Sequence, residues 1–200
     1  MTHISLDFET YSEVDISECG AHVYARHPST EILIACYSFD EGETVHAWRK
    51  GDLAPMSIVN AIKDGWKIRA FNSDFEELIW RFAGTRVGWP ELPADTWIDT
   101  MALCNALALP GSLEKAATVL GLPVAKNKDG KRLIRKFSKP RKPTKNNPAA
   151  RLFPEDEPDE FQLFVNYCAD DVRVECAIYQ AIPMKTLQGF EPEVYEQNRK

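Results

Sequence analysis

The segment 4–10, Ile-Ser-Leu-Asp-Phe-Glu-Thr, alternates apolar and polar side chains, and this two-residue period constrains the fold more than any other part of the sequence. Its apolar side chains share one face of a strand, while Asp7 and Glu9 share the other, about 6.5–7 Å apart along the chain. Two carboxylates held side by side on a half-buried strand repel each other unless a cation lies between them, most often a divalent metal bound through oxygen. The segment therefore predicts a metal-ligating strand. The alternative is an edge strand with a solvated acidic face.

Strand and helix patterns alternate along the rest of the chain and indicate an α/β fold. The predicted strands are 3–9, 31–39, 44–48 and 67–71, of which the second and third form a hairpin. The predicted helices are 55–62, 73–83, 99–108, 112–120 and 159–182. Ser112 is expected to cap the helix that begins there, and Pro183 to end the last helix. The 200 residues suffice for one domain, expected over 1–200.

Composition excludes several classes of protein. Hydrophobic residues at 44% and charged residues at 27% are typical of a globular chain. No apolar run approaches the roughly 18 residues of a membrane span, and the N-terminus lacks a basic-then-apolar signal. The five cysteines include no Cys-x-x-Cys pair, so neither a zinc site nor a disulfide framework is indicated. A reducing, cytosolic compartment is therefore expected, with no membrane partner.

Charge is distributed unevenly along the chain. The formal net charge is −6, yet residues 126–151 hold eleven Lys and Arg against one acid. A basic segment on an acidic body suggests a polyanion partner. Leu133, Ile134 and Phe137 predict a short amphipathic helix that contacts the core, which favours an ordered phosphate-binding element over a solvated linker. The prolines that follow extend this basic, proline-rich segment to about 126–158.

The predicted helix 159–182 carries acids on two different faces. Its apolar side chains recur at helical spacing, and at about 100° per residue Tyr167 and Asp171 lie on the flank of this stripe, one turn apart. Asp170 falls on the far face, toward water. Asp171 can therefore reach a cleft beside the core, and the alternative is a surface acid.

The predicted helix 73–83 leaves one choice open. Asp74 and Glu76 flank its apolar stripe on opposite sides, so only one of them can face a given cleft. Periodicity does not decide which.

Three acidic motifs follow one another along the chain: Asp7-Phe8-Glu9-Thr10, Ala70-Phe71-Asn72-Ser73-Asp74-Phe75-Glu76 and Tyr167-Cys168-Ala169-Asp170-Asp171. In this order they resemble the motifs of the 3′–5′ proofreading exonuclease domain of family A DNA polymerases, especially the phage-type branch. Matching text at 110–117, 130–134 and 139–142 extends the resemblance over nearly the whole chain. It implies membership of the DEDD superfamily, tyrosine subclass, and a ribonuclease-H-like exonuclease fold with a central mixed sheet flanked by helices.

The family's pattern also bears on the second and third motifs. Its second-motif acid lies four residues after the Asn, which is Glu76 here, although Asp is the commoner residue and Asp74 remains the alternative. The histidine-type subclass would have His at position 166, which is Asn166. The third motif therefore resembles the tyrosine type.

The resemblance implies hydrolysis of phosphodiesters with two divalent cations, Mg²⁺ or Mn²⁺, about 3.5–4 Å apart. Carboxylates suit these hard cations. By the family's pattern Asp7 would bridge both ions, Glu9 and Asp171 would complete the tighter site, and Glu76 would hold the second ion. Tyr167 would orient the attacking water. Because the acids repel one another without metal, metal is expected to stabilise the fold.

The implied substrate is single-stranded DNA or a frayed 3′ end, cut to nucleoside 5′-monophosphates. Tyr11 and Phe75 are candidates to stack on a base, and the alternative for both is a core position. The residues expected to contact DNA are Thr10, Asn72, Lys131, Arg132, Arg135, Lys136, Lys139, Arg141 and Lys142.

The resemblance further implies a bacterial or phage-infected host cytoplasm and a polymerase domain or polymerase partner, because the text at 190–196 resembles the lead into a polymerase portion. The sequence leaves open whether the chain acts alone or is part of a polymerase. Two other functions also remain open: an exoribonuclease or oligonucleotidase of the same superfamily, and a catalytically degenerate module that binds nucleic acid.

Overall fold

The predicted first strand lies at the centre of a mixed sheet. The computed structural model describes residues 2–123, 129–143 and 149–182. In this part of the chain one open sheet has the strand order β3-β2-β1-β4-β5. Its strands are β1 (His3–Tyr11), β2 (Glu31–Ser38), β3 (His46–Arg49), β4 (Lys67–Ala70) and β5 (Trp97–Asp99). The first three are antiparallel neighbours, whereas β4 runs parallel to β1 and β5 parallel to β4. The predicted α/β class is confirmed, and the arrangement is compatible with a ribonuclease-H-like fold.

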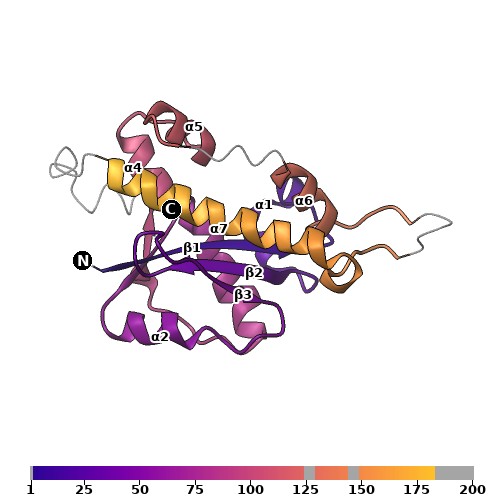
Figure 1. The fold of residues 1–200 in the computed structure, drawn as a ribbon. Coiled ribbons are helices and arrows are strands. Elements are labelled where there is room, and N and C mark those ends of the chain that lie inside the picture. The colour runs from indigo at the N-terminus through magenta and orange to yellow at the C-terminus, as the bar shows by residue number, and fades with distance from the viewer. Residues whose placement is uncertain (1, 124–128, 144–148, 183–200) are drawn as a thin grey trace.

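Helices pack on both faces of this sheet (Figure 1). On one face α7 (Pro158–Ala181), the longest at 24 residues, crosses β1 and β2 beside α6 (Gly130–Phe137). The other face holds α2 (Met56–Lys63) and α3 (Ser73–Ile79), which continues as the π-helical turn η1 (Trp80–Gly84). The remaining described helices are α1 (Ile16–Arg26), α4 (Thr100–Ala106), α5 (Leu113–Val119) and the short turns η2 (Ala94–Thr96) and η3 (Pro154–Asp156).

The alternation in β1 divides the core into two parts. The apolar side chains of β1 join α2 and α3 in a cluster where the Trp89 ring lies against Trp48 and Trp80, with centroids 4.9 and 4.7 Å away. On the opposite face β2 packs against the predicted apolar stripe of α7. Because strand neighbours point to opposite faces, Asp7 and Glu9 are turned toward α7.

The amphipathic helix predicted within the basic segment is α6. Leu133 and Phe137 are fully buried against α7, and the Phe137 ring stacks on Phe164 at 5.7 Å between centroids. The basic side chains of α6 lie on its outer side, where Lys131 and Arg135 are exposed. Residues 126–128 and 144–148 of the segment, together with Pro183 and 190–196, lie outside the described residues.

Several expectations about element boundaries are corrected by the structure. Helix α1 and the short strand β5 were not predicted. The helix expected from 99 begins after Asp99, whose carboxylate accepts hydrogen bonds from the backbone N–H of Met101 (2.8 Å) and Ala102 (3.1 Å) and so caps α4. Ser112 occupies the N-cap position of α5, but its side chain makes no capping hydrogen bond, so the predicted cap is wrong.

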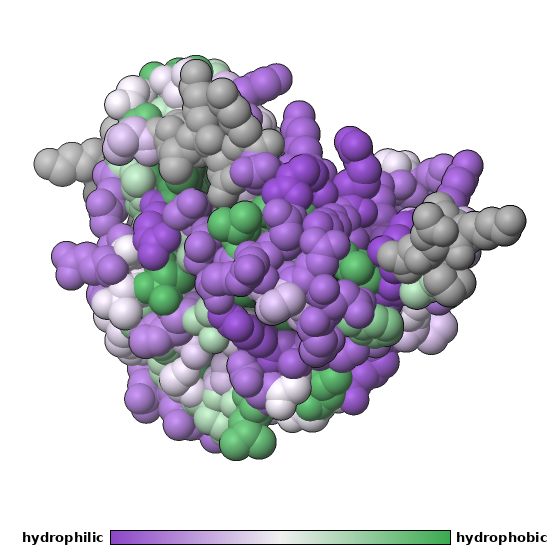
Figure 2. Space-filling view, turned by 45° about the vertical axis from the view of Figure 1, so that its right-hand side comes forward, coloured by the Kyte–Doolittle hydropathy of each residue, from purple (hydrophilic) through white to green (hydrophobic). Residues whose placement is uncertain are grey.

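Figure 2 shows one face of the molecule as mainly hydrophilic, with small and separate hydrophobic patches. Among the residues that the structure describes, no helix combines the length and the apolar character needed to cross a bilayer.

Candidate metal centre

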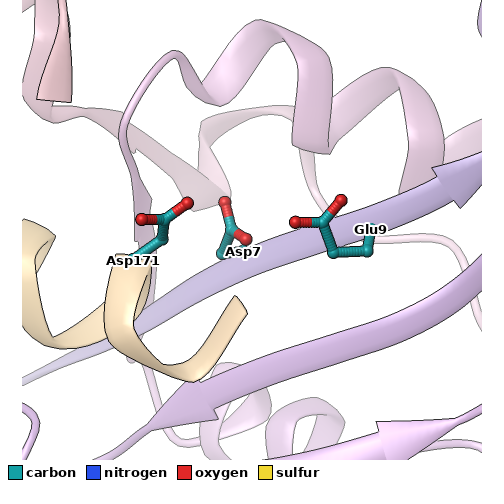
Figure 3. Close-up of side chains that lie close together, drawn as sticks. All are labelled: Asp7, Glu9 and Asp171. Carbon is teal, nitrogen blue, oxygen red and sulfur yellow. The ribbon is translucent and has the colours of Figure 1, made fainter. Parts of the chain in front are cut away.

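Three carboxylates converge where α7 crosses β1. Asp7, Glu9 and Asp171 each offer an oxygen, and these atoms lie within 4.8 Å of one another. Figure 3 shows the side chains of Asp7 and Glu9 on the same side of β1, with Asp7 between Glu9 and the Asp171 that α7 presents. Glu9 is buried, whereas Asp7 and Asp171 are partly exposed. The strand period and the helical flank predicted from sequence therefore bring these residues together.

A buried contact fixes α7 against β1 at this point. Cys168 is fully buried, and its thiol donates to the backbone carbonyl of Asp7 at 3.5 Å. Asp171 follows Cys168 by one turn of α7, and it is therefore carried to the side of Asp7. Asp170 lies on the other flank of the helix, where its carboxylate pairs with Arg173 at 2.9 Å.

The fourth predicted acid is also buried. Glu76 is 4% exposed, while Asp74 is exposed. Of the two acids that periodicity left open, Glu76 is the one that faces inward, on a helix that follows the left-handed backbone of Asn72 (φ 73°, ψ 55°). Glu76 lies outside the three-carboxylate group but close enough for the charge of Asp7 to act on it. Its Oε2 is buried without a hydrogen-bond partner.

The four carboxylates lie in an electrostatically unfavourable environment, because they are close together and largely buried. Burial raises the pKa of Asp7, Glu9 and Glu76 well above their usual range, and repulsion from neighbouring carboxylates adds to it. Burial likewise raises the pKa of Asp171 to about 6, against the lowering effect of a hydrogen bond with Tyr167. In the described part of the chain no basic side chain forms an ion pair with any of the four. A bound cation would relieve this repulsion.

Tyr167 lies on α7 one turn before Asp171. Its ring stacks on Phe164 at 6.3 Å between centroids and lies against the backbone of Gly130. Burial, together with the charges of Asp171 and Glu9, raises the pKa of the Tyr167 phenol. The phenol is therefore neutral near neutral pH and serves as a hydrogen-bond donor toward the acids.

A cavity of about 180 Å³ opens beside Glu9. Its wall is mostly apolar and aromatic, and it is formed by Phe8, Glu9, Thr10, Val14, Ile16, Tyr24, Phe75, Ile134, Ser138 and Lys139. Of the two aromatic residues considered for stacking, Phe75 lines this cavity. Tyr11 does not: it is 4% exposed and covered by the Arg151 guanidinium, 3.7 Å from its ring centroid.

The residues predicted to contact DNA are placed in different ways. The Thr10 hydroxyl is buried against the Tyr24 hydroxyl at 2.8 Å, whereas Asn72 is exposed. In the basic segment Lys131, Arg135 and Lys142 are exposed. The others are engaged within the protein, Arg132 with Asp129 and Glu160, Lys136 with Glu157 and Glu160, Lys139 with Asp15, and Arg141 with the Ala149 carbonyl.

Sequence reasoning missed the residues that hold the acids in place. Cys168 was read as part of an apolar stripe and of the third motif, and Gly130 only as part of the matching text at 130–134. Each acts through a contact with a residue distant in sequence, which local periodicity cannot reveal.

The fold and the site together define an α/β domain of ribonuclease-H-like type with an acidic cluster between its first strand and its last described helix. No family model matches the sequence. The chain is 37% identical over 195 residues to a protein named DNA polymerase from Bacillus phage SP02. The match covers 96% of this chain but 29% of that polymerase, so the chain spans less than a third of its relative. The similarity supports a polymerase-related domain.

Proposed function

We propose that this chain is a metal-dependent 3′–5′ exonuclease that hydrolyses DNA from the 3′ end and releases nucleoside 5′-monophosphates. The observation that carries the proposal is the convergence of Asp7, Glu9 and Asp171 within 4.8 Å, without a basic partner in the described residues. Like charges so close are tolerated where a cation is to be bound. The similarity to a phage DNA polymerase supports a role on DNA, associated with a polymerase.

The donor set fits two divalent cations, Mg²⁺ or Mn²⁺. All its ligand atoms are carboxylate oxygens, which hard cations prefer over nitrogen and sulfur. The buried Oε2 of Glu76 lacks a hydrogen-bond partner, and such an atom calls for an explanation that a metal or its water supplies. Asp7, Glu9 and Asp171 would hold one ion, and Asp7 with Glu76 the other. When bound, the ions would activate a water and stabilise the leaving oxygen.

The protein's own groups would orient the reactants. The neutral phenol of Tyr167 is within hydrogen-bonding reach of Asp171 and acted on by the charge of Glu9, so it can donate to a water or phosphate oxygen between them. The apolar cavity beside Glu9 would hold the terminal nucleoside, with Phe75 available to stack on its base.

The exposed cations of α6 would contact the DNA backbone. Lys131 and Arg135 are exposed and form no ion pair with another described residue, whereas Arg132 and Lys136 must first leave their carboxylate partner Glu160 on α7. We therefore assign the larger share of backbone binding to Lys131 and Arg135.

A direct test uses 5′-labelled single-stranded DNA and a matched RNA, with Mg²⁺ or Mn²⁺ and with a chelator. The wild type is compared with Asp7→Ala and Glu76→Ala, and with Asp74→Ala as the matched control for the second motif. We expect a ladder that shortens from the 3′ end and is lost in the first two variants only. Preferential cleavage of RNA would identify an exoribonuclease instead. DNA binding without cleavage would identify a degenerate binding module and overturn the proposal.

A further inference from the structure

A second acid of α7 is buried one turn beyond Asp171. Glu175 is 3% exposed, and each of its carboxylate oxygens accepts hydrogen bonds. Ser5 donates to Oε2, while Thr100 Oγ1 (2.5 Å) and Arg69 Nε (2.9 Å) donate to Oε1. A charged group this deeply buried is stable only when it is paired and fully hydrogen-bonded, and Glu175 meets both conditions.

The partners of Glu175 come from three separate elements. Ser5 lies on β1 two residues before Asp7, Arg69 lies on β4, and Thr100 begins α4. Glu175 therefore ties α7 to the strand that carries Asp7 and to the neighbouring parallel strand. The thiol contact of Cys168 with β1 lies before Asp171 on α7, and this network lies after it.

Arg69 is itself held by other contacts. Its guanidinium is 1% exposed, pairs with Glu41 through two hydrogen bonds of 2.7 and 3.3 Å, and lies 3.9 Å from the Tyr179 ring centroid. Planar bidentate pairing fixes the orientation of a guanidinium as well as its position. The pair with Glu41 therefore holds the Arg69 side chain in one orientation toward Glu175. A purely apolar contact in this place would allow α7 to slide or rotate, whereas directed hydrogen bonds do not.

We propose that Glu175 is a positioning residue: through Ser5, Arg69 and Thr100 it fixes the axial and rotational setting of α7, and thereby holds the Asp171 carboxylate beside Asp7. The placement of Asp171 is a structural statement, and its importance for metal binding rests on the proposed function. Glu175 is not a metal ligand, since its oxygens are already occupied by three donors.

The test measures Mn²⁺ binding by calorimetry in the purified protein. Glu175→Ala removes the hydrogen bonds to Ser5, Arg69 and Thr100, and Glu175→Gln keeps an acceptor oxygen for Arg69. Thr100→Val removes one hydrogen bond at nearly constant volume and is mild enough to keep the fold. Ile58→Ala is the matched control, because Ile58 is fully buried on α2, on the other side of the sheet. Unfolding midpoints are recorded for all variants.

We expect Glu175→Ala to weaken Mn²⁺ binding by about tenfold or more and Thr100→Val by a few fold, as is usual for residues that orient metal ligands. Glu175→Gln should lie between wild type and Glu175→Ala. Ile58→Ala should bind Mn²⁺ as wild type does, despite its lower midpoint. Equal losses in Ile58→Ala and Glu175→Ala, or no loss in Glu175→Ala and Thr100→Val, would overturn the proposal.

Amide hydrogen exchange separates this inference from the proposed function. If wild type binds no Mn²⁺, the proposed function fails, but the placement of Asp171 is still tested. We then expect Glu175→Ala and Thr100→Val to speed exchange at residues 168–175 more than in the sheet, and Ile58→Ala not to do so. Uniform acceleration in all three variants would show that Glu175 contributes stability alone.

Discussion

Gly130 and Tyr167 are in direct contact, with no room for a side chain between them. A Cβ at position 130 would lie 2.8 Å from Cδ2 and 2.9 Å from Cζ of the Tyr167 ring, well inside van der Waals contact. Gly130 is buried at the start of α6, and Tyr167 faces the carboxylate cluster from α7. The close approach of α6 therefore depends on glycine and fixes where the tyrosine ring lies.

Gly130→Ala is expected to displace the Tyr167 ring and to slow cleavage by about tenfold, because small misplacements of a positioning group are costly. Single-turnover cleavage of labelled DNA measures this. Since the change acts through Tyr167, the double variant Gly130→Ala/Tyr167→Phe should be no slower than Tyr167→Phe alone. Additive losses in the double variant would show that Gly130 acts by another route.

Glu76→Gln is expected to stabilise the metal-free protein near neutral pH by on the order of 1 kcal/mol. One oxygen of the buried carboxylate, Oε2, lacks a hydrogen-bond partner, and the group is repelled by Asp7; the amide removes that repulsion. Urea unfolding in a chelator measures the effect, with the exposed Asp74→Asn as control. A less stable Glu76→Gln protein would mean that the carboxylate makes a favourable contact in the folded state.

The stability of the metal-free protein should fall as pH rises from about 4 to about 7. The folded-state pKa of Asp171 is raised to about 6, and those of Asp7 and Glu9 are raised as well, so over this range the folded state holds more protons than the unfolded state. Loss of a proton on raising the pH therefore costs more free energy in the folded protein than in the unfolded chain. Thermal unfolding at a series of pH values with a chelator follows this trend.

Added Mg²⁺ or Mn²⁺ should reverse that fall. Because the cations bind the ionised carboxylates, the rise in melting temperature should be larger above about pH 6 than below it. The same dependence in an Asp7→Ala variant would place the stabilising ions elsewhere on the protein.

Lys131→Ala and Arg135→Ala should each weaken binding of single-stranded DNA and lower the slope of its salt dependence by somewhat less than one ion, about 0.7 per phosphate contact. Arg132→Ala should have a smaller effect, since Arg132 is paired with Glu160 in the free protein. Fluorescence anisotropy over a series of salt concentrations gives both quantities. A larger loss in Arg132→Ala would mean that this ion pair opens when DNA binds.

Local periodicity was sufficient for the elements that carry Asp7, Glu9 and Asp171. The alternation in β1 placed two acids on one face, and the apolar stripe of α7 placed Tyr167 and Asp171 on its flank. Both patterns are set by residues that are close in sequence to the acids themselves. The choice between Asp74 and Glu76 could not be made in this way, because it depends on how α3 packs against other elements of the fold.

Helix α1 was missed because it shows little helical pattern. Gly20 interrupts it with φ 76°, and only Tyr24 and Ala25 are buried, so no apolar stripe forms. Glu175 was missed for a different reason. It lies seven residues after Cys168, about 20° from it around the helix. Periodicity therefore puts this acidic residue on the core-facing side of α7. Its partner Arg69 is 106 residues away, and a single sequence gives no means of pairing them.

The hydrogen bond from Cys168 to the Asp7 carbonyl joins residues 161 positions apart. A ribosome releases β1 and α3 before α7, so Asp7, Glu9 and Glu76 emerge well before Asp171 and Tyr167. The acidic cluster is therefore completed only after α7 has emerged. A nascent or proteolysed fragment that stops short of α7 contains the sequence of β1 to β5 but lacks Asp171 and Tyr167.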